Sequence, residues 1–95
     1  MLYVSLMKFT GEGAKNVKGT VERTEQNRKL MEAAGGKLVS VFWTQGRYDL
    51  VAISDWPDDE SAMAFLLQLC MGGNVTTETL RAFDEVQMKR ILAKM

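Results

Sequence analysis

The sequence has no histidine, one cysteine and one proline among its 95 residues. Without an imidazole, the chain cannot build a histidine-based Ser or Cys triad, or a histidine-ligated zinc or haem site. One cysteine forms no disulfide framework, and with seven methionines it fits a reducing compartment. We therefore expect a cytoplasmic protein with no metal and no cofactor. Any chemistry must rest on carboxylates, Tyr, Arg, Lys or Cys70.

An excess of charge is also missing, because 12 basic residues balance 12 acidic ones. No basic stripe points to nucleic acid, and no apolar run reaches the roughly 18–20 residues that cross a bilayer. Met1 leads straight into alternating residues without a charged segment or a cleavage site, so we expect no signal peptide. The length predicts one domain, residues 1–95, which buries about 60–65% of its unfolded surface.

Hydrophobic periodicity and glycine positions predict the element order β-α-β-β-α-β-α. The predicted strands are 2–9, 37–44, 48–54 and 75–83. The first predicted helix covers about 14–34. The second starts within 55–60 and ends at 72–74, and the third starts at 84–85. Residues 10–13 are expected to form a loop, and Gly19 either kinks the first helix or separates a short first turn from it. Two crossovers around a central hairpin give an α+β, ferredoxin-like fold. It has a four-stranded antiparallel sheet, two helices on one face and an extra C-terminal helix.

The first three predicted strands are apolar on both faces, although a sheet covered on one side only should alternate. In the first strand Leu2, Val4 and Leu6 oppose Tyr3, Met7 and Phe9. Covering several hundred Å² of such a face is worth on the order of 10 kcal/mol before association costs. We predict that a second copy covers the uncovered face, assigned here to Tyr3, Val41 and Leu50, in a homodimer or higher homo-oligomer. The C-terminal helix would cover part of that face or embrace the neighbour, and a monomer is the alternative.

Several segments together resemble the GYD domain family. They are Glu12-Gly13-Ala14-Lys15, Gly35-Gly36-Lys37, Gly46-Arg47-Tyr48-Asp49, Ser54-Asp55-Trp56-Pro57-Asp58 and Thr76-Thr77-Glu78-Thr79-Leu80. The resemblance implies a dimeric α/β-barrel association, in which ferredoxin-like subunits pair sheet to sheet. It implies no established reaction. The wider barrel group includes sensing domains, monooxygenases and isomerases, so the resemblance does not choose between binding and catalysis.

Arg47, Tyr48 and Asp49 are the candidates for chemistry at the turn into the third strand. Tyr48 and Asp49 could act as catalytic proton donor and acceptor at a cavity mouth, with Arg47 binding an anion. Alternatively, Asp49 accepts hydrogen bonds from the hairpin backbone while Tyr48 packs on the sheet.

The candidate ligand-binding residues beyond this turn lie mainly on one face of the fourth strand. Thr77, Thr79 and Arg81 would line a partly apolar hollow with Tyr3, Ser5 and Trp43, if that face points into a dimer interior. The alternative is an edge strand whose Thr and Arg side chains face solvent. Trp43 could be a wall of this hollow or an interface anchor, and the amphipathic indole favours the interface.

Other conspicuous residues favour structural roles. Cys70 falls on an apolar helical stripe with Ala62, Phe65, Leu66 and Leu69, which predicts core packing. Asp55, Asp58, Asp59 and Glu60 suit a helix start rather than a metal site, and Trp56 is expected to pack there. Gly11 and Gly13 lack the Lys-Ser/Thr ending of a phosphate loop.

Two functions follow from these patterns. The favoured one is an oligomeric module that binds a small polar or aromatic ligand in a cavity at the sheet face. The alternative is a small cofactor-independent enzyme, which transfers a proton or inserts oxygen using Asp49, Tyr48 and Arg81. The missing histidine favours the first.

Overall fold

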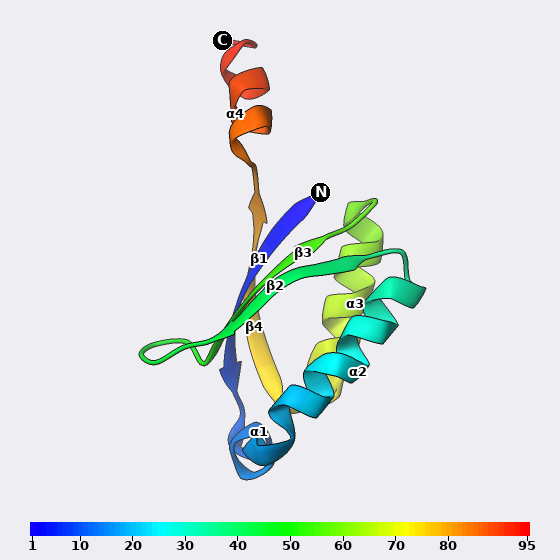
Figure 1. Ribbon diagram of the computed structural model, residues 1–95, viewed down its shortest axis with the longest axis vertical. Helices are drawn as coiled ribbons and strands as arrows, with labels where there is room; N and C mark the ends of the chain where they lie inside the picture. The colour runs from blue at the N-terminus through cyan, green and yellow to red at the C-terminus, as the bar shows by residue number, and fades with distance from the viewer.

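A computed structural model describes the whole chain, residues 1–95 (Figure 1). The elements are β1 (Leu2–Phe9), α1 (Gly11–Lys15), η1 (Val17–Gly19), α2 (Thr20–Ala33), β2 (Lys37–Trp43), β3 (Leu50–Asp55), α3 (Asp59–Met71), β4 (Val75–Ala82) and α4 (Glu85–Leu92). This order confirms the predicted α+β, ferredoxin-like fold with an additional C-terminal helix.

The four strands form one antiparallel sheet in the order β2-β3-β1-β4. β1 lies inside the sheet, where Val4 pairs with Ile53 of β3 and with Leu80 of β4. The two long helices lie on one face, where α2 contacts β2 and α3 contacts β4, so each helix lies over an outer strand (Figure 1). The middle strands β3 and β1 therefore form the floor between the helices.

The covered face is not the one that the sequence pattern suggested. Tyr3, Val41 and Leu50 lie beneath the helices, where Leu50 is buried and the other two pack against the core. The expectation that they form the uncovered face was therefore wrong. The alternation of side chains along a strand determines which residues share a face of the sheet. When both faces are apolar, the sequence does not indicate which face the helices cover.

The uncovered face, called the open face below, is nonetheless apolar. Pairing partners and alternation place seven large apolar side chains on it: Leu2, Val4, Leu6, Phe42, Val51, Ile53 and Leu80. Phe42 and Leu80 remain 58% and 53% exposed. Both faces are thus apolar, as predicted, but the residues expected on the uncovered face lie on the covered face and the reverse.

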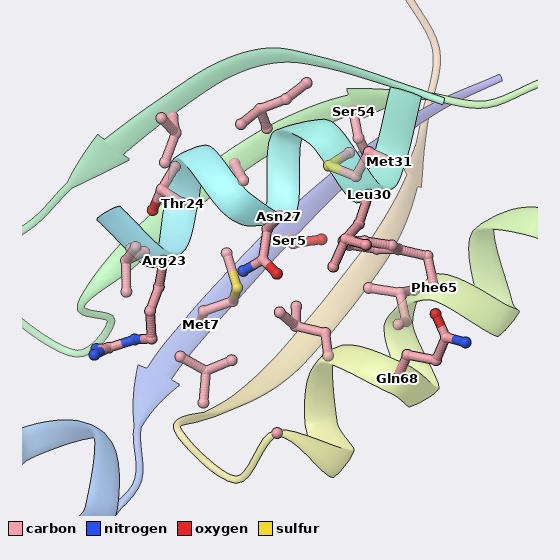
Figure 2. A pocket seen from close by; sticks show the side chains of 18 of the residues that line it. Ser5, Met7, Arg23, Thr24, Asn27, Leu30, Met31, Ser54, Phe65 and Gln68 are labelled. Atoms are coloured by element: carbon pink, nitrogen blue, oxygen red, sulfur yellow. The ribbon is translucent and has the colours of Figure 1, made fainter. Parts of the chain in front are cut away.

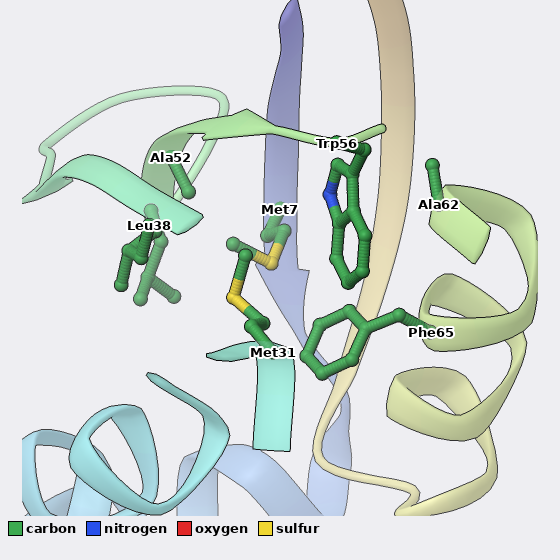
Figure 3. Close-up of a cluster of buried hydrophobic side chains, with 8 residues drawn as sticks. Met7, Met31, Leu38, Ala52, Trp56, Ala62 and Phe65 are labelled. Carbon is green, nitrogen blue, oxygen red and sulfur yellow. The ribbon is translucent and has the colours of Figure 1, made fainter. Parts of the chain in front are cut away.

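A small core joins the sheet to the helices (Figure 3). Its buried members are Met7, Met31, Leu38, Leu50, Ala52, Trp56, Ala62 and Phe65. Trp56 lies at its centre with 3% exposure, and its indole N–H donates to Ser54 Oγ at 3.1 Å. The indole also lies against Gly36, where an added Cβ would come within 2.7 Å of the ring. Trp56 therefore packs at the approach to α3, as its position beside Pro57 indicates.

The molecule exposes more surface than a compact monomer. Its accessible area is 6542 Å², against about 5,500 Å² for a folded monomer of this mass. Its radius of gyration is 14.3 Å, against about 12.4 Å for a compact chain of this length. Part of the difference comes from α4, which projects away from the sheet beyond the end of β4 (Figure 1).

Two local expectations are corrected by the structure. Residues 11–13 begin α1 rather than a loop, because Thr10 caps the helix by accepting the Gly13 N–H at 3.1 Å. Cys70 is exposed rather than buried. At 3.6 residues per turn it lies about 80° around α3 from Ala62, at the margin of the apolar stripe. None of the helices combines the length and apolarity needed to span a bilayer.

Candidate ligand-binding cavity

A cavity of about 330 Å³ lies between the sheet and the two long helices (Figure 2). The helices lie over the outer strands, so the space between them is closed only in part by side chains. Residues from α2, α3 and all four strands line it. The volume falls at the lower end of the range for small-molecule sites, about 300–1,000 Å³.

The inner wall of the cavity is apolar and rich in polarisable groups. Met7 of β1 and Met31 of α2 extend into it, and Phe65 of α3 faces them (Figures 2 and 3). Trp56 packs on Phe65 with ring centroids 5.3 Å apart and an interplanar angle of 38°. Thioethers and tilted aromatic rings make favourable contacts with an aromatic guest.

The polar groups on the sheet side of the cavity already have partners. Ser5 is buried and shares a 3.1 Å hydrogen bond with Thr79, which in turn lies 2.9 Å from the hydroxyl of Thr77. The Ser54 hydroxyl accepts the indole N–H of Trp56. These hydroxyls therefore satisfy one another and leave the floor largely apolar.

The helix side of the cavity carries polar groups with unused capacity. Asn27 of α2 is half-buried, and its side-chain amide has no hydrogen-bond partner within the chain and projects into the cavity (Figure 2). Arg23, one turn earlier, has the only charged side chain in the lining. It donates one N–H to the carbonyl of Asn16 at 2.7 Å. Sequence analysis missed both residues, although Asn27 falls at helical spacing between Thr24 and Met31.

The predicted ligand-binding residues are only partly brought together. Tyr3, Thr77, Thr79 and Arg81 share the covered face, since Tyr3 pairs with Arg81 and Met7 with Thr77. Of the residues predicted to line a hollow, Tyr3 and Ser5 line the cavity, whereas Thr77, Thr79, Arg81, Arg47 and Trp43 do not. The guanidinium of Arg81 donates to the carbonyls of Leu2 and Ala82, and lies 4.5 Å from the ring centroid of Phe83. Its donors are thus turned to the backbone at the sheet's end.

Tyr3 and Trp43 also make bonds within the fold. The Tyr3 hydroxyl donates to Asp59, and this hydrogen bond raises the pKa of Tyr3 above its ordinary value, with desolvation adding to the effect. The indole N–H of Trp43 donates to Thr20 Oγ1 at 3.1 Å, linking the end of β2 to the start of α2. These bonds tie the sheet to the first turns of α3 and α2.

Asp49 fastens the β2–β3 loop to β1. Its Oδ2 accepts the Phe9 N–H at 2.8 Å, and its own N–H donates to the Met7 carbonyl at 2.8 Å. The loop turns at Gly46, which has φ +111°. The Asp49 carboxylate therefore accepts from a backbone amide of β1, and not from the hairpin backbone as the structural alternative expected.

Tyr48 lies outside the cavity, where its hydroxyl donates to Glu78 Oε2 at 2.9 Å. This hydrogen bond raises the pKa of Tyr48, because ionisation would place a phenolate beside a carboxylate. The Arg47 guanidinium lies 5.7 Å from the Tyr48 ring centroid. The turn therefore holds a protonated phenol.

The residues of the enzyme hypothesis do not share one site. Asp49 is bonded to Phe9, whereas Arg81 pairs with Tyr3, six residues away along β1. At about 3.3 Å per residue, this separation is about 20 Å. A catalytic role for Asp49 and Tyr48 stays a sequence-based prediction. No group of three or more Cys, Asp or Glu side chains lies close enough to hold a metal ion.

Comparison with known proteins gives one finding. The family model of the GYD domain matches residues 3–92, nearly the whole chain. No curated protein and no solved structure shows significant similarity. The match covers every strand and helix described above, including α4, except for the first residue of β1. The chain therefore belongs to the GYD domain family.

Proposed function

We propose that the protein binds a small polar or aromatic molecule in the cavity between its sheet and its helices α2 and α3. The observation that carries this proposal is the combination of an apolar, partly aromatic wall with an unpaired amide, that of Asn27. An apolar cavity with a few convergent polar groups is the usual design of a small-molecule site. The other polar groups of the floor already hydrogen-bond one another, so a guest need not satisfy them.

Calorimetric titration of the full chain with 2-naphthalenemethanol tests this proposal. We expect a Kd below about 1 mM, since a guest of this size can supply several kcal/mol by burial alone. Ala52→Leu, which adds side-chain volume to the cavity floor, should abolish binding. Ala64→Leu, the same change on the exposed side of α3, should leave it intact. Binding that survives Ala52→Leu in a folded variant would place the guest elsewhere.

We infer further that a second copy of the chain covers the open face. The molecule exposes roughly 1,000 Å² more than a compact monomer, and a standard interface buries about 800 Å² per partner. The apolar stripe of α4 adds a second unpartnered surface, formed by Met88, Ile91 and Leu92 at i, i+3 and i+4. A homodimer would keep water from the back of the sheet whose front forms the cavity floor.

The exposed thiol supports a cytoplasmic location. Cys70 is free and exposed, and its side chain is the only thiol of the chain. An exposed thiol persists best in a reducing compartment. Labelling of intact cells with a membrane-impermeant thiol reagent should leave Cys70 unmodified, while lysed cells should show modification.

A further inference from the structure

The charge in the cavity is of one sign. Arg23 is the only lining residue that is charged at neutral pH, since no Asp, Glu or Lys contributes to the walls. In an apolar site of low dielectric constant, one guanidinium favours an anionic guest and disfavours a cationic one. The lining therefore favours a guest that carries a negative charge.

Arg23 keeps donors free for such a guest. A guanidinium has five N–H donors, and Arg23 uses one of them on the Asn16 carbonyl. This bond holds the side chain at the end of the cavity nearest α1 (Figure 2). Arg23 forms no ion pair with an acidic side chain, so its charge is not neutralised within the fold. A planar fork of this kind matches a carboxylate better than a point charge does.

Asn27 follows Arg23 by one helical turn. Residues at i and i+4 project from the same face of a helix with Cβ atoms about 5–6 Å apart, so α2 presents both groups to the cavity. The amide of Asn27 can donate to an anionic oxygen or accept from a hydroxyl. The Asn27 amide points towards Met7, while the Arg23 guanidinium extends away from it towards α1 (Figure 2), so Arg23 must turn towards Asn27 for both groups to bind one carboxylate.

The apolar part of the cavity sets the body of the guest. A cavity of about 150 Å³ accommodates benzene, so about 330 Å³ leaves room for two fused rings or one ring with a short chain. Met7, Met31 and Phe65 provide the contacts for these rings. Arg23, Asn27 and these apolar side chains all line the same cavity.

We propose that the ligand is an aromatic carboxylate of one or two rings, whose carboxylate is bound by Arg23 and Asn27 and whose rings lie against Met7, Met31 and Phe65. This proposal rests on the function proposed above and narrows it to one chemical class. The carboxylate replaces its lost water with charge-assisted hydrogen bonds, which are shorter and stronger than neutral ones.

Three matched probes test the class on the full chain: 2-naphthoate, 2-naphthalenemethanol and 2-naphthylmethylammonium. Calorimetry should show 2-naphthoate binding at least about tenfold more tightly than the alcohol, and the ammonium compound not binding. Arg23→Gln should remove the preference for the carboxylate, so that the variant binds 2-naphthoate and the alcohol with about equal affinity. Arg23→Lys, which keeps the charge but not the fork, should retain part of the preference.

A control on the same helix separates the site from the general charge of the protein. Arg28 pairs with Glu25 at 3.1 Å and does not line the cavity, so Arg28→Gln should not change any of the three affinities. Circular dichroism confirms that each variant is folded. Equal affinity of the parent protein for the carboxylate and the alcohol, or a preference that survives Arg23→Gln, overturns the assignment while cavity binding itself stands. Failure of all three probes to bind overturns the proposed function as well.

Discussion

The two faces of the sheet have similar amounts of apolar side chain but different surroundings. The covered face packs Met7, Leu50 and Ala52 beneath helices that do not fully close over it. The open face presents Val4, Leu6 and Ile53 to the outside with no element above them. The comparison shows that strands of the same composition can form a cavity on one side of a sheet and an uncovered apolar surface on the other.

The largest effect is expected from removing an aromatic ring on each face in turn. Trp56→Ala should lower the free energy of unfolding by about 3–5 kcal/mol, because it empties the centre of the core. Phe42→Ala, on the open face, should cost less than about 1 kcal/mol in dilute solution. Denaturant titration at low protein concentration measures both. Similar losses for the two variants would mean that the faces do not differ as described.

A charge placed on the open face should act on association instead of folding. Val4→Lys should weaken the homodimer by at least about 100-fold, since an interface core tolerates unpaired charge poorly. Sedimentation velocity should then show single chains, whereas the unfolding midpoint of the monomer stays close to that of the parent. Met63→Lys, the matched change on the exposed surface of α3, should leave association unchanged. If the parent protein is monomeric at all concentrations, the open face is not an interface between copies of this chain.

Asp49 offers a smaller and more local test. Asp49→Ala should cost about 1–3 kcal/mol, because the Phe9 N–H loses its acceptor. Asp49→Asn should recover most of the loss, since an amide oxygen can still accept. Neither change should alter the affinity for 2-naphthalenemethanol, as Asp49 does not line the cavity. Loss of ligand binding in the folded Asn variant would restore Asp49 to a functional role.

The smallest effect is a dependence of stability on pH at the start of α3. Asp58 accepts the backbone N–H and the hydroxyl of Ser61, and these hydrogen bonds lower its pKa below the unfolded value of 3.8. Its contribution is therefore fully present above pH 3.8 and is lost as the pH falls through the folded pKa. Asp58→Asn keeps a good N-cap but cannot titrate, so it should flatten the acid limb of the stability curve. Glu60→Gln, in the same turn, serves as the control.

The fold was predictable because local signals agree with it. Gly35-Gly36 ends a helix, Gly46 turns a hairpin, and Asp58 and Asp84 cap the helices that follow them. The covered face was not predictable, since strands that are apolar on both sides carry no mark of where a helix will lie. Cys70 shows a similar limit, because a residue at the edge of a stripe can fall on either side of the boundary.

The cavity was less predictable than the fold. Tyr3 was recognised as a possible lining residue, but Thr77, Thr79 and Arg81 are occupied by hydrogen bonds within the sheet and its backbone. Arg23 and Asn27 gain their importance from the positions of α2 and α3 over the outer strands, which is a property of tertiary packing. An asparagine at helical spacing between Thr24 and the buried Met31 is the signal that could have revealed one of them.

Gly36 gives the cavity a determinant that lies outside its lining. The Trp56 indole rests on this glycine so closely that even a methyl group would displace the ring. An alanine or serine in place of Gly36 would therefore force the indole into another position and change the size of the cavity. In this way Gly36, which does not line the cavity, sets the space that a guest can occupy.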